Sequence, residues 1–267
     1  MRRFQKVVIL AIFALFAMIG SVQDAVAALQ SKTLDYQVGA KNFKGYLAWD
    51  DAFPGKRPGI LVVHEFWGLN DYAKSRADQL AKLGYVAFAG DMFGDGKVAA
   101  HPDEARAMAK ETTSNVAEWV ARAQAALDTL RRQPNVDPTR LAAIGYCFGG
   151  ATVLQLAFSG ADLKLSASFH GSLPVPESAT KVRGELLIFH GGSDTFISAE
   201  TIQKFRAKLD EAKISYRFIV YPGAVHAFTV PGAEKRGIAN VAYNAEADQK
   251  SWQELVASLS RVFSSTK

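Results

Sequence analysis

The residue whose type and setting most strongly suggest chemistry is Cys147, the only cysteine among 267 residues. It lies at the centre of the sequence G-Y-C-F-G-G, residues 145–150. The apolar run 141–144 is typical of a buried strand and residues 150–158 have helical spacing, so Cys147 stands at a strand–turn–helix junction. Such a turn exposes its central side chain, and the glycines at 145 and 149 lack the Cβ atoms that would clash as the chain doubles back. We therefore interpret Cys147 as a nucleophile.

A thiol in this position is suited to attack a carbonyl group. The helix that follows Cys147 offers the positive end of its dipole and free N–H groups, both of which favour the thiolate. The backbone N–H of Phe148 is placed to bind the oxyanion that forms during the attack. A dinucleotide-binding turn is excluded, because G-x-G-x-x-G would need a glycine at position 147. The plainer alternatives are a buried, inert cysteine and a glycine-rich packing turn.

Asp194 and His226 follow Cys147 in the order that a nucleophile–acid–histidine triad requires. Asp194 lies just after the apolar run 186–189, and His226 lies after the apolar run 216–221. Taken alone, Asp194 would be a turn residue or a helix cap, and His226 a solvated loop residue. Their order and their positions after strands instead favour His226 as the base and Asp194 as the acid that orients it. An ordinary histidine base predicts a rate that rises between about pH 5 and 8.

The sequence H-E-F-W-G, residues 64–68, leaves another apolar run at 59–63. Its position is that of the second oxyanion donor in folds with such a nucleophile turn, and we assign this donor to the backbone N–H of Phe66. A zinc-protease helix is excluded, because H-E-x-x-H needs a histidine at position 68. The other histidines lack the close spacing of metal ligands, so we expect neither a metal nor a cofactor. Three histidines end strands and should tie loops together by hydrogen bonds: His64, His170 and His190.

Strand patterns and helix patterns alternate along the chain. The predicted strands are a pair within residues 34–49 and single runs at 59–63, 85–89, 141–144, 165–169, 186–189 and 216–221. The predicted helices are 71–83, a stretch that opens at Pro102, 116–132, 150–158, 198–212 and 241–263. This alternation indicates an α/β fold, with a mostly parallel sheet covered by helices on both faces. Sites in such folds lie at the carboxyl ends of the strands, where Cys147, Asp194 and His226 are expected.

The first 27 residues have the features of a secretory signal peptide. A basic start is followed by the almost wholly apolar residues 7–19, and A-V-A at residues 25–27 offers the small side chains that a signal peptidase reads. A retained membrane anchor is the alternative, but a spanning helix needs roughly 20 apolar residues. We expect cleavage after Ala27 and export to the bacterial periplasm or the medium, without membrane attachment. Residues 28–267 then form one large domain.

The composition is that of a globular protein, with 49% hydrophobic and 21% charged residues. The formal net charge is +5, but no run of Lys and Arg is dense enough to indicate a nucleic-acid or anionic-membrane partner. A single cysteine cannot form a disulfide within the chain, and exported proteins tend to pair their thiols or to lack them. We expect a monomer whose partner is a small-molecule substrate.

Four motifs together resemble the dienelactone hydrolase family of α/β-hydrolases, in which cysteine replaces the usual serine nucleophile. They are H-E-x-x-G at 64–68, G-Y-C-F-G-G at 145–150, H-G-x-x-D at 190–194 and G-x-x-H-x-F at 223–228. The resemblance implies the α/β-hydrolase fold and hydrolysis of an ester or lactone through an acyl-enzyme, with Cys147, Asp194 and His226 as the triad. It also implies that Glu65 contacts the thiol and takes part in its activation when substrate binds. The plainer interpretation of Glu65 is a loop carboxylate that fixes backbone.

One position departs from the family's founding enzymes, which hold a substrate carboxylate with arginines, one of them four residues after the catalytic histidine. Here that position is Val230, and an apolar side chain cannot offset the desolvation of a carboxylate. We therefore expect neutral esters or lactones, unless Arg106 or Arg236 restores an anion site. The pocket should be lined in part by Phe66, Trp67, Phe148 and Val230. The alternative function is a non-catalytic binding protein or thiol sensor, against which an intact triad argues.

Overall fold

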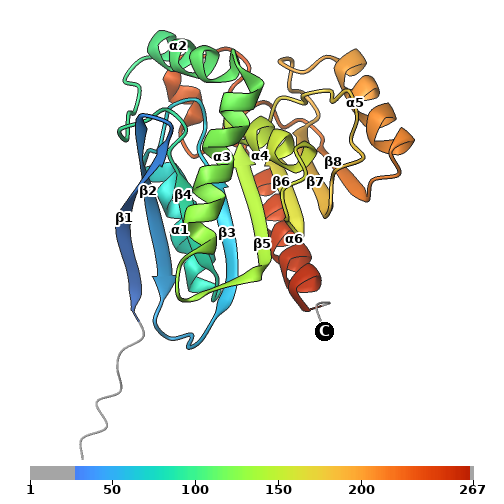
Figure 1. Cartoon of the computed structure of the whole chain (residues 1–267). Coiled ribbons are helices and arrows are strands. Elements are labelled where there is room, and N and C mark those ends of the chain that lie inside the picture. Colours follow the sequence, from blue (N-terminus) through green and yellow to red (C-terminus); the bar gives the residue numbers. More distant parts are fainter. Residues whose placement is uncertain (1–27, 265–267) are drawn as a thin grey trace, which may run out of the picture.

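The computed structural model describes residues 28–264, and the strands of this part of the chain form one sheet (Figure 1). In chain order they are β1 (Leu29–Val38), β2 (Lys41–Asp50), β3 (Arg57–Val63), β4 (Val86–Gly90), β5 (Val136–Tyr146), β6 (Leu165–Phe169), β7 (Glu185–Gly191) and β8 (Tyr216–Tyr221). Their order across the sheet is β1-β2-β4-β3-β5-β6-β7-β8. β1 pairs antiparallel with β2, and β2 antiparallel with β4. The pairings from β4 to β8 are parallel.

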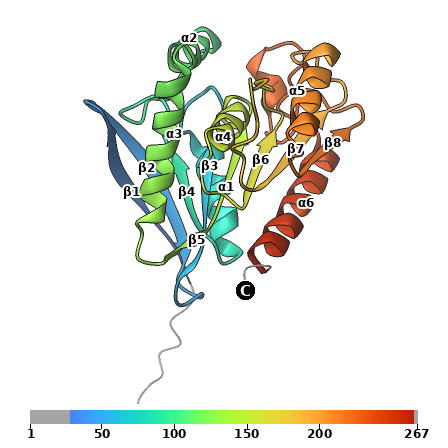
Figure 2. The ribbon, with the colours of Figure 1, turned by 45° about the vertical axis from the view of Figure 1, so that its right-hand side comes forward.

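Helices cover both faces of this sheet (Figures 1 and 2). They are α1 (Asp71–Lys82), α2 (Pro102–Thr113), α3 (Val116–Arg131), α4 (Phe148–Phe158), α5 (Ala199–Glu211), the short 3-10 helix η1 (Ala233–Arg236) and α6 (Ala245–Ser264). Helices α1 and α6 pack on one face, and α3, α4 and α5 on the other. The mostly parallel sheet with helices on both faces confirms the predicted fold class.

Polar side chains cap the N-termini of several helices by accepting a hydrogen bond from a free backbone N–H of the first turn. Asn70 caps α1, Asn115 caps α3 and Ser198 caps α5. Such a cap is typically worth about 1 kcal/mol relative to alanine. These caps explain why the observed helix starts agree closely with those predicted from the apolar spacing.

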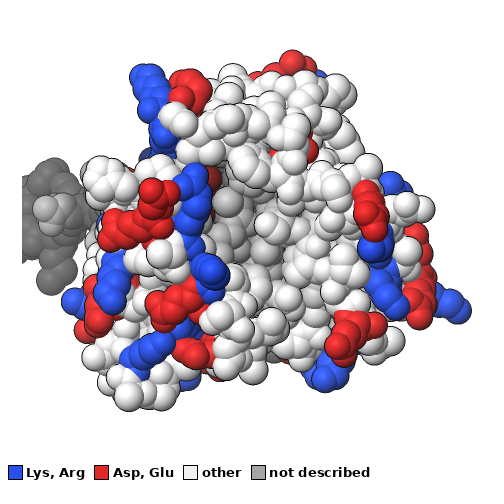
Figure 3. Space-filling model, turned by 90° about the horizontal axis from the view of Figure 1, so that it is seen from above, with Lys and Arg blue, Asp and Glu red and all other residues white. Residues whose placement is uncertain are grey.

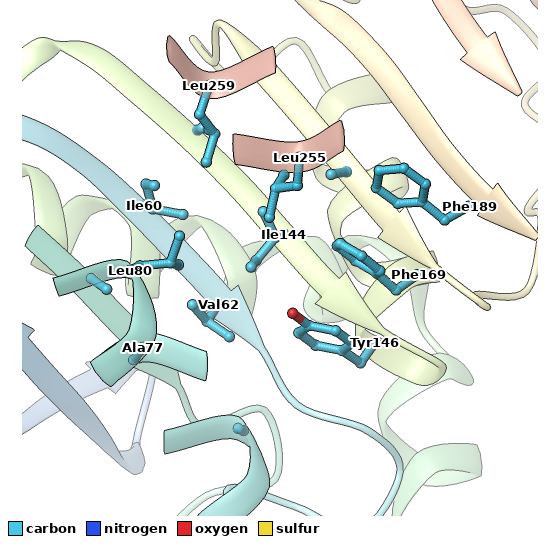
Figure 4. Close-up of a cluster of buried hydrophobic side chains, with 14 of the residues drawn as sticks. Ile60, Val62, Ala77, Leu80, Ile144, Tyr146, Phe169, Phe189, Leu255 and Leu259 are labelled. Atoms are coloured by element: carbon cyan, nitrogen blue, oxygen red, sulfur yellow. The ribbon is translucent and has the colours of Figure 1, made fainter. Parts of the chain in front are cut away.

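A core of aliphatic and aromatic side chains fills the space between the sheet and the layer of α1 and α6 (Figure 4). Ile60 and Val62 of β3 and Ile144 of β5 are fully buried, as are Leu80 of α1 and Leu255 of α6. Full burial of one such side chain contributes roughly 1.5–3 kcal/mol. The central strands β3 and β5 are covered from both sides, and this fixes the turns at their carboxyl ends.

The strand register places the carboxyl ends of neighbouring strands level with one another. Val63 of β3 pairs with Gly145 of β5, and Tyr146 pairs with Phe169 of β6. The residues that follow these strands therefore emerge along a single edge of the sheet. Helix α2 lies beyond this same edge (Figure 2), so the predicted site residues meet beneath it.

Two elements differ from the prediction. Strand β5 begins at Val136, ahead of the predicted run 141–144, because Val136 pairs with Arg57 while the polar residues between hide the strand pattern. The last helix was expected from residue 241, but Val241 forms a β-bridge with His226 and α6 begins only at Ala245. The 3-10 helix η1 was not predicted at all.

The predicted signal peptide, residues 1–27, lies outside the described residues. The described chain starts at Ala28 and enters β1 at Leu29. Within residues 28–264, no helix combines the length and the apolar character that crossing a bilayer requires.

Candidate active site

Cys147 lies at the turn between β5 and α4, where the motif G-x-C-x-G predicted it. Its φ is 54° and its ψ is −115°, a costly backbone conformation that persists only where the surroundings hold it. A Cβ on Gly145 would lie 2.0 Å from the carbonyl oxygen of Gly149, and a Cβ on Gly149 would lie 2.2 Å from that of Val63. The two glycines are therefore required for the chain to double back and expose Cys147.

The fold brings Cys147, His226 and Asp194 together from three separate loops. Nε2 of His226 lies 3.1 Å from Sγ of Cys147, and Nδ1 lies 2.8 Å from Oδ2 of Asp194. The side chain of Asp194 has no exposed surface, and its other oxygen accepts a hydrogen bond from the backbone N–H of Phe196 at 2.8 Å. The imidazole is thus aligned between sulfur and carboxylate, as proton transfer to and from the sulfur requires.

Asn240 connects the loops of Asp194 and His226, and sequence analysis did not single it out. Its side-chain oxygen accepts a hydrogen bond from the N–H of Thr195 at 2.8 Å, and its amide group donates to the carbonyl of Ser193 at 3.1 Å. Its own carbonyl accepts from the N–H of His226 at 3.2 Å. Asn240 has a left-handed backbone, with φ of 59°. A lone asparagine in an irregular segment gives no sequence pattern that would reveal this role.

The protonation of His226 is controlled by its neighbours. Burial disfavours a charge on its imidazole, but the negative charge of the Cys147 thiolate and the hydrogen bond to Asp194 outweigh burial and raise the pKa of His226 to about 10. At neutral pH the imidazole of His226 is therefore protonated. Phe196 covers the imidazole edge-to-face, with 5.0 Å between ring centres.

Glu65 lies in the wall of the site and is only 3% exposed. Burial raises the pKa of this carboxyl group, although the charges of Arg236 and His226 partly oppose the shift. Nη1 of Arg236 lies 4.0 Å from Oε2 of Glu65, and Oε2 has no hydrogen-bond partner among the described residues. The described hydrogen bond of the Cys147 sulfur is to His226 rather than to Glu65, and the part of Glu65 in activating the thiol when substrate binds stays a prediction.

A cavity of about 600 Å³ opens beside Cys147 and His226. Figure 3 shows this end of the molecule, where uncharged side chains line most of a central hollow and Lys and Arg side chains border it on one side. The volume is in the range of small-molecule sites. Its lining contains the four predicted residues Phe66, Trp67, Phe148 and Val230, together with Trp119, Leu173, Pro174, Phe196, Ile197 and Ile238.

The two predicted arginines occupy different positions around this cavity. Arg106 on α2 lines the rim, where its side chain is 58% exposed and pairs with Asp103 at 2.6 Å. Arg236 on η1 stacks over the ring of Trp67, with 4.5 Å from the guanidinium carbon to the ring centre. The structure therefore places an arginine in the cavity wall near Val230, but one whose charge faces Glu65.

The two predicted oxyanion donors both line the cavity. Phe148 is the first residue of α4, so its backbone N–H has no partner within the helix. Phe66 lies in a turn closed by the hydrogen bond from the N–H of Gly68 to the carbonyl of Glu65 at 3.2 Å. These two amides follow the carboxyl ends of the neighbouring parallel strands β5 and β3, which the sheet register places side by side.

The predicted loop ties by histidines are confirmed for two of three residues. His64 bonds the carbonyl of Glu65 at 2.6 Å and accepts from the N–H of Met92 at 3.1 Å. His170 bonds Thr229 at 2.8 Å, whereas the ring of His190 packs against Phe218 instead. In the described part of the chain, no three His, Cys, Asp or Glu side chains come close enough to share a metal ion.

The fold and the cysteine turn define the class of protein, an α/β-hydrolase. The sequence model of the dienelactone hydrolase family matches residues 43–263, and the chain belongs to this family. A protein of Synechocystis sp. with the provisional name carboxymethylenebutenolidase is 30% identical over 228 residues, covering 79% of this chain and 88% of the relative. A similarly named protein of Yersinia pestis is 29% identical over 230 residues, covering 79% and 80%. The chain is therefore a hydrolase.

Among solved structures, the chain is similar to a dienelactone hydrolase-like promiscuous phosphotriesterase from metagenomic libraries. The two share 38% sequence identity with a TM-score of 0.86, and the similarity covers 88% of this chain and 99% of the other. The described fold is thus that of the dienelactone hydrolases over nearly its whole length.

Proposed function

We propose that this hydrolase cleaves carboxylic esters or lactones through a thioester formed on Cys147. The observation that carries the proposal is the alignment of Sγ of Cys147 with Nε2 of His226 at 3.1 Å, and of Nδ1 with Asp194 at 2.8 Å, beside a cavity of about 600 Å³. A nucleophile, a base and an orienting acid within hydrogen-bond reach are the arrangement that acyl transfer needs.

In the first half of the reaction, the thiolate of Cys147 attacks the carbonyl carbon of the substrate. The carbonyl oxygen takes up the negative charge and is bound by the backbone N–H groups of Phe148 and Phe66. The imidazolium of His226 then gives its proton to the leaving alkoxide, the C–O bond breaks and a thioester remains. In a lactone the alcohol stays attached to the acyl group.

In the second half, water hydrolyses the thioester. His226 is neutral after the first half and takes a proton from the attacking water. The C–S bond breaks, the acid leaves and the thiolate of Cys147 is restored beside a protonated His226. Asp194 keeps the imidazole in place throughout, and its carboxylate stabilises the imidazolium.

The cavity wall favours neutral substrates. Val230 is 2% exposed and lines the cavity where the family's founding enzymes have an arginine, and the nearby guanidinium of Arg236 faces Glu65. A substrate carboxylate would have to replace an existing partner of Arg236, and it gains no hydrogen bond from Val230. Losing one charge-assisted hydrogen bond costs about 1.5–3 kcal/mol.

The test compares kcat/KM for a panel of purified ester and lactone substrates, using residues 28–267 and the variant Cys147→Ala as control. Turnover of neutral esters or enol-lactones that the control lacks is expected. A preference of ten-fold or more for a carboxylate-bearing dienelactone over a neutral enol-lactone of similar size, lost in Arg236→Ala, would contradict the substrate preference. Absence of turnover over the whole panel, or equal turnover by the control, would contradict the proposed function itself.

A second candidate substrate class is neutral phosphotriesters. It is favoured by the 38% identity to the promiscuous phosphotriesterase and by the many apolar side chains that line the cavity. The thiolate of Cys147 would displace an aryl oxide from phosphorus, and water would then cleave the P–S bond. A dialkyl aryl phosphate releases a coloured phenol in this reaction. Release by wild type but not by Cys147→Ala supports the activity, and equal background rates exclude it.

We also propose that residues 1–27 are removed as a signal peptide and that the mature protein is exported as a monomer. The first described strand, β1, begins at Leu29, so cleavage after Ala27 leaves the described sheet intact. N-terminal sequencing of protein from the periplasm or medium should find Ala28 or a near neighbour. A membrane-bound product that retains Met1 would contradict export. Light scattering of the mature protein would test the monomer.

A further inference from the structure

A second buried histidine, His170, lies beside His226, and the proposed reaction gives it no part. It follows β6, has no exposed surface and has a left-handed backbone with φ of 41°. Its ring meets that of His226 edge-to-face, with 5.3 Å between ring centres and 65° between planes. His170 and Phe196 therefore enclose the imidazole of His226, and restrict how it can turn.

A chain of hydrogen bonds leads from Arg76 through two hydroxyl groups to His170. Nε of Arg76, which can only donate, lies 3.3 Å from the hydroxyl of Tyr72. That hydroxyl lies 2.6 Å from Oγ1 of Thr229, and Oγ1 lies 2.8 Å from Nε2 of His170. The order that gives both hydroxyl protons an acceptor runs from Tyr72 to Thr229 and from Thr229 to His170. Nε2 of His170 is then an acceptor.

This direction keeps the imidazole of His170 neutral, with its hydrogen on Nδ1, which has no hydrogen-bond partner among the described residues. A second proton on Nε2 would leave the hydroxyl proton of Thr229 without an acceptor inside the protein, which is costly. Burial lowers the pKa of His170 well below its usual value, and the positive charges of His226 and Arg76 lower it further. The remaining ionisable group that packs on His170 is Tyr146 of β5, with 6.0 Å between ring centres.

Arg76, where this chain of hydrogen bonds begins, is held in place by several contacts. Arg76 is 5% exposed, donates to the carbonyl of Thr229 at 2.9 Å and pairs with Asp248 of α6 at 2.5 Å. The same guanidinium therefore holds the backbone of Thr229, three residues after His226, and the hydroxyl that begins the chain. Helices α1 and α6 are joined to the loop of His226 through these contacts.

We propose that His170 is a positioning residue for His226. The hydrogen bonds from Arg76 through Tyr72 and Thr229 keep the imidazole of His170 uncharged. Two histidines this close in a buried site would otherwise compete for one proton. Because His170 is denied that proton, His226 keeps the imidazolium that pairs with Cys147. The inference rests on the proposed function for the role of that imidazolium.

The experiment interrupts the hydrogen-bond chain at two residues and compares each variant with a matched control. Thr229→Val removes the hydroxyl while keeping the shape, and Thr229→Ser restores it. Tyr72→Phe removes the hydroxyl that donates to Thr229. The controls are Thr129→Val in α3 and Tyr46→Phe, whose hydroxyls bond Ala125 and Asp78 away from the site.

Three quantities are measured for each protein: kcat and KM for a neutral ester, and the pKa values of His226 and His170 by NMR titration without substrate. In Thr229→Val and Tyr72→Phe, we expect kcat to fall about tenfold at similar KM, as for a small misplacement of a catalytic group. The pKa of His170 should rise and that of His226 should fall. Thr229→Ser and both controls should match the wild type.

Unchanged pKa values of His170 and His226 in both Thr229→Val and Tyr72→Phe would overturn the proposal. Equal losses of kcat in the matched controls would also overturn it. If Thr229→Val fails to fold, Tyr72→Phe decides by the same criteria. The NMR titration separates the two levels of the account, because it needs no turnover. If the wild type hydrolyses no ester but the variants show the expected pKa shifts, the proposed function is contradicted and the role of the hydrogen-bond chain still holds.

Discussion

The two sides of the triad are held by different means. On the side of Cys147, backbone geometry does the positioning, with Gly145 and Gly149 packed so closely that no Cβ fits. On the side of His226, side-chain hydrogen bonds do it, through Asn240 and through Thr229. The nucleophile therefore sits on a rigid turn, whereas the base and acid sit on loops tied by a few polar contacts.

This difference predicts which substitutions the site should tolerate. Adding a side chain at Gly145 or Gly149 should distort the turn, because the closely packed backbone atoms around it have little room to move. A loop tied by hydrogen bonds loses alignment by degrees as single ties are cut. The predictions below test this contrast, from the largest expected effect to the smallest.

The largest effect is expected from Cys147→Ala. It removes the nucleophile and the charge that keeps His226 protonated, so ester hydrolysis should fall by about four powers of ten or more. The fold should persist, because the change removes only one sulfur atom beside the cavity. Initial rates on a neutral ester and a circular dichroism spectrum measure both. Wild-type turnover with a normal spectrum would refute the assignment.

Next is Gly149→Ala, which adds one methyl group to the turn. Its Cβ would lie 2.2 Å from the carbonyl oxygen of Val63, so the strand end or α4 must shift. We expect the free energy of unfolding to fall by about 3 kcal/mol, the upper part of the range for overpacking, and activity to fall with it. Thermal denaturation should show a Tm lower by roughly 6–12 °C. An unchanged Tm would mean that the turn is not rigid.

A smaller effect is expected from Asn240→Ala. It cuts the side-chain ties to Ser193 and Thr195 but leaves the triad residues in place. We expect kcat to fall about tenfold with KM nearly unchanged, since a loosened acid and base misalign the proton transfer. Gln124→Ala, in the middle of α3, is the matched control and should keep wild-type kcat. Equal losses in both variants would indicate a general loss of stability instead.

The subtlest prediction concerns pH. A pKa of His226 raised to about 10 keeps its imidazole protonated as the pH rises through neutrality. The acylation step should therefore be flat between about pH 6 and 8, and not rise as an ordinary histidine base predicts. In the acyl-enzyme the charge of Cys147 no longer raises the pKa of His226, so the pKa of His226 should fall and deacylation should rise with pH. Single-turnover kinetics separate the two steps, and a rising acylation rate would contradict the ion pair.

The contrast between the two sides also explains what the sequence could predict. The turn at Cys147 depends on neighbours in sequence, so its glycines and the following helix are visible as a motif. Asp194 and His226 could be found because order along the chain and strand ends restrict their positions. Asn240, Thr229 and Arg76 could not be found, because their roles arise only when separate elements meet. The same reason hid the stacking of Arg236 on Trp67, because sequence analysis considered Arg236 only as a residue that could restore an anion site.

The most direct test of the account is to trap the acyl-enzyme and locate it. Wild-type protein mixed with a slowly hydrolysed neutral ester, quenched in acid and measured by intact mass spectrometry, should gain the mass of one acyl group. Fragmentation should place that group on Cys147, and prior alkylation with iodoacetamide should prevent it. An acyl group on another residue, or turnover that continues after Cys147 is fully alkylated, would contradict the central claim that this thiol is the nucleophile.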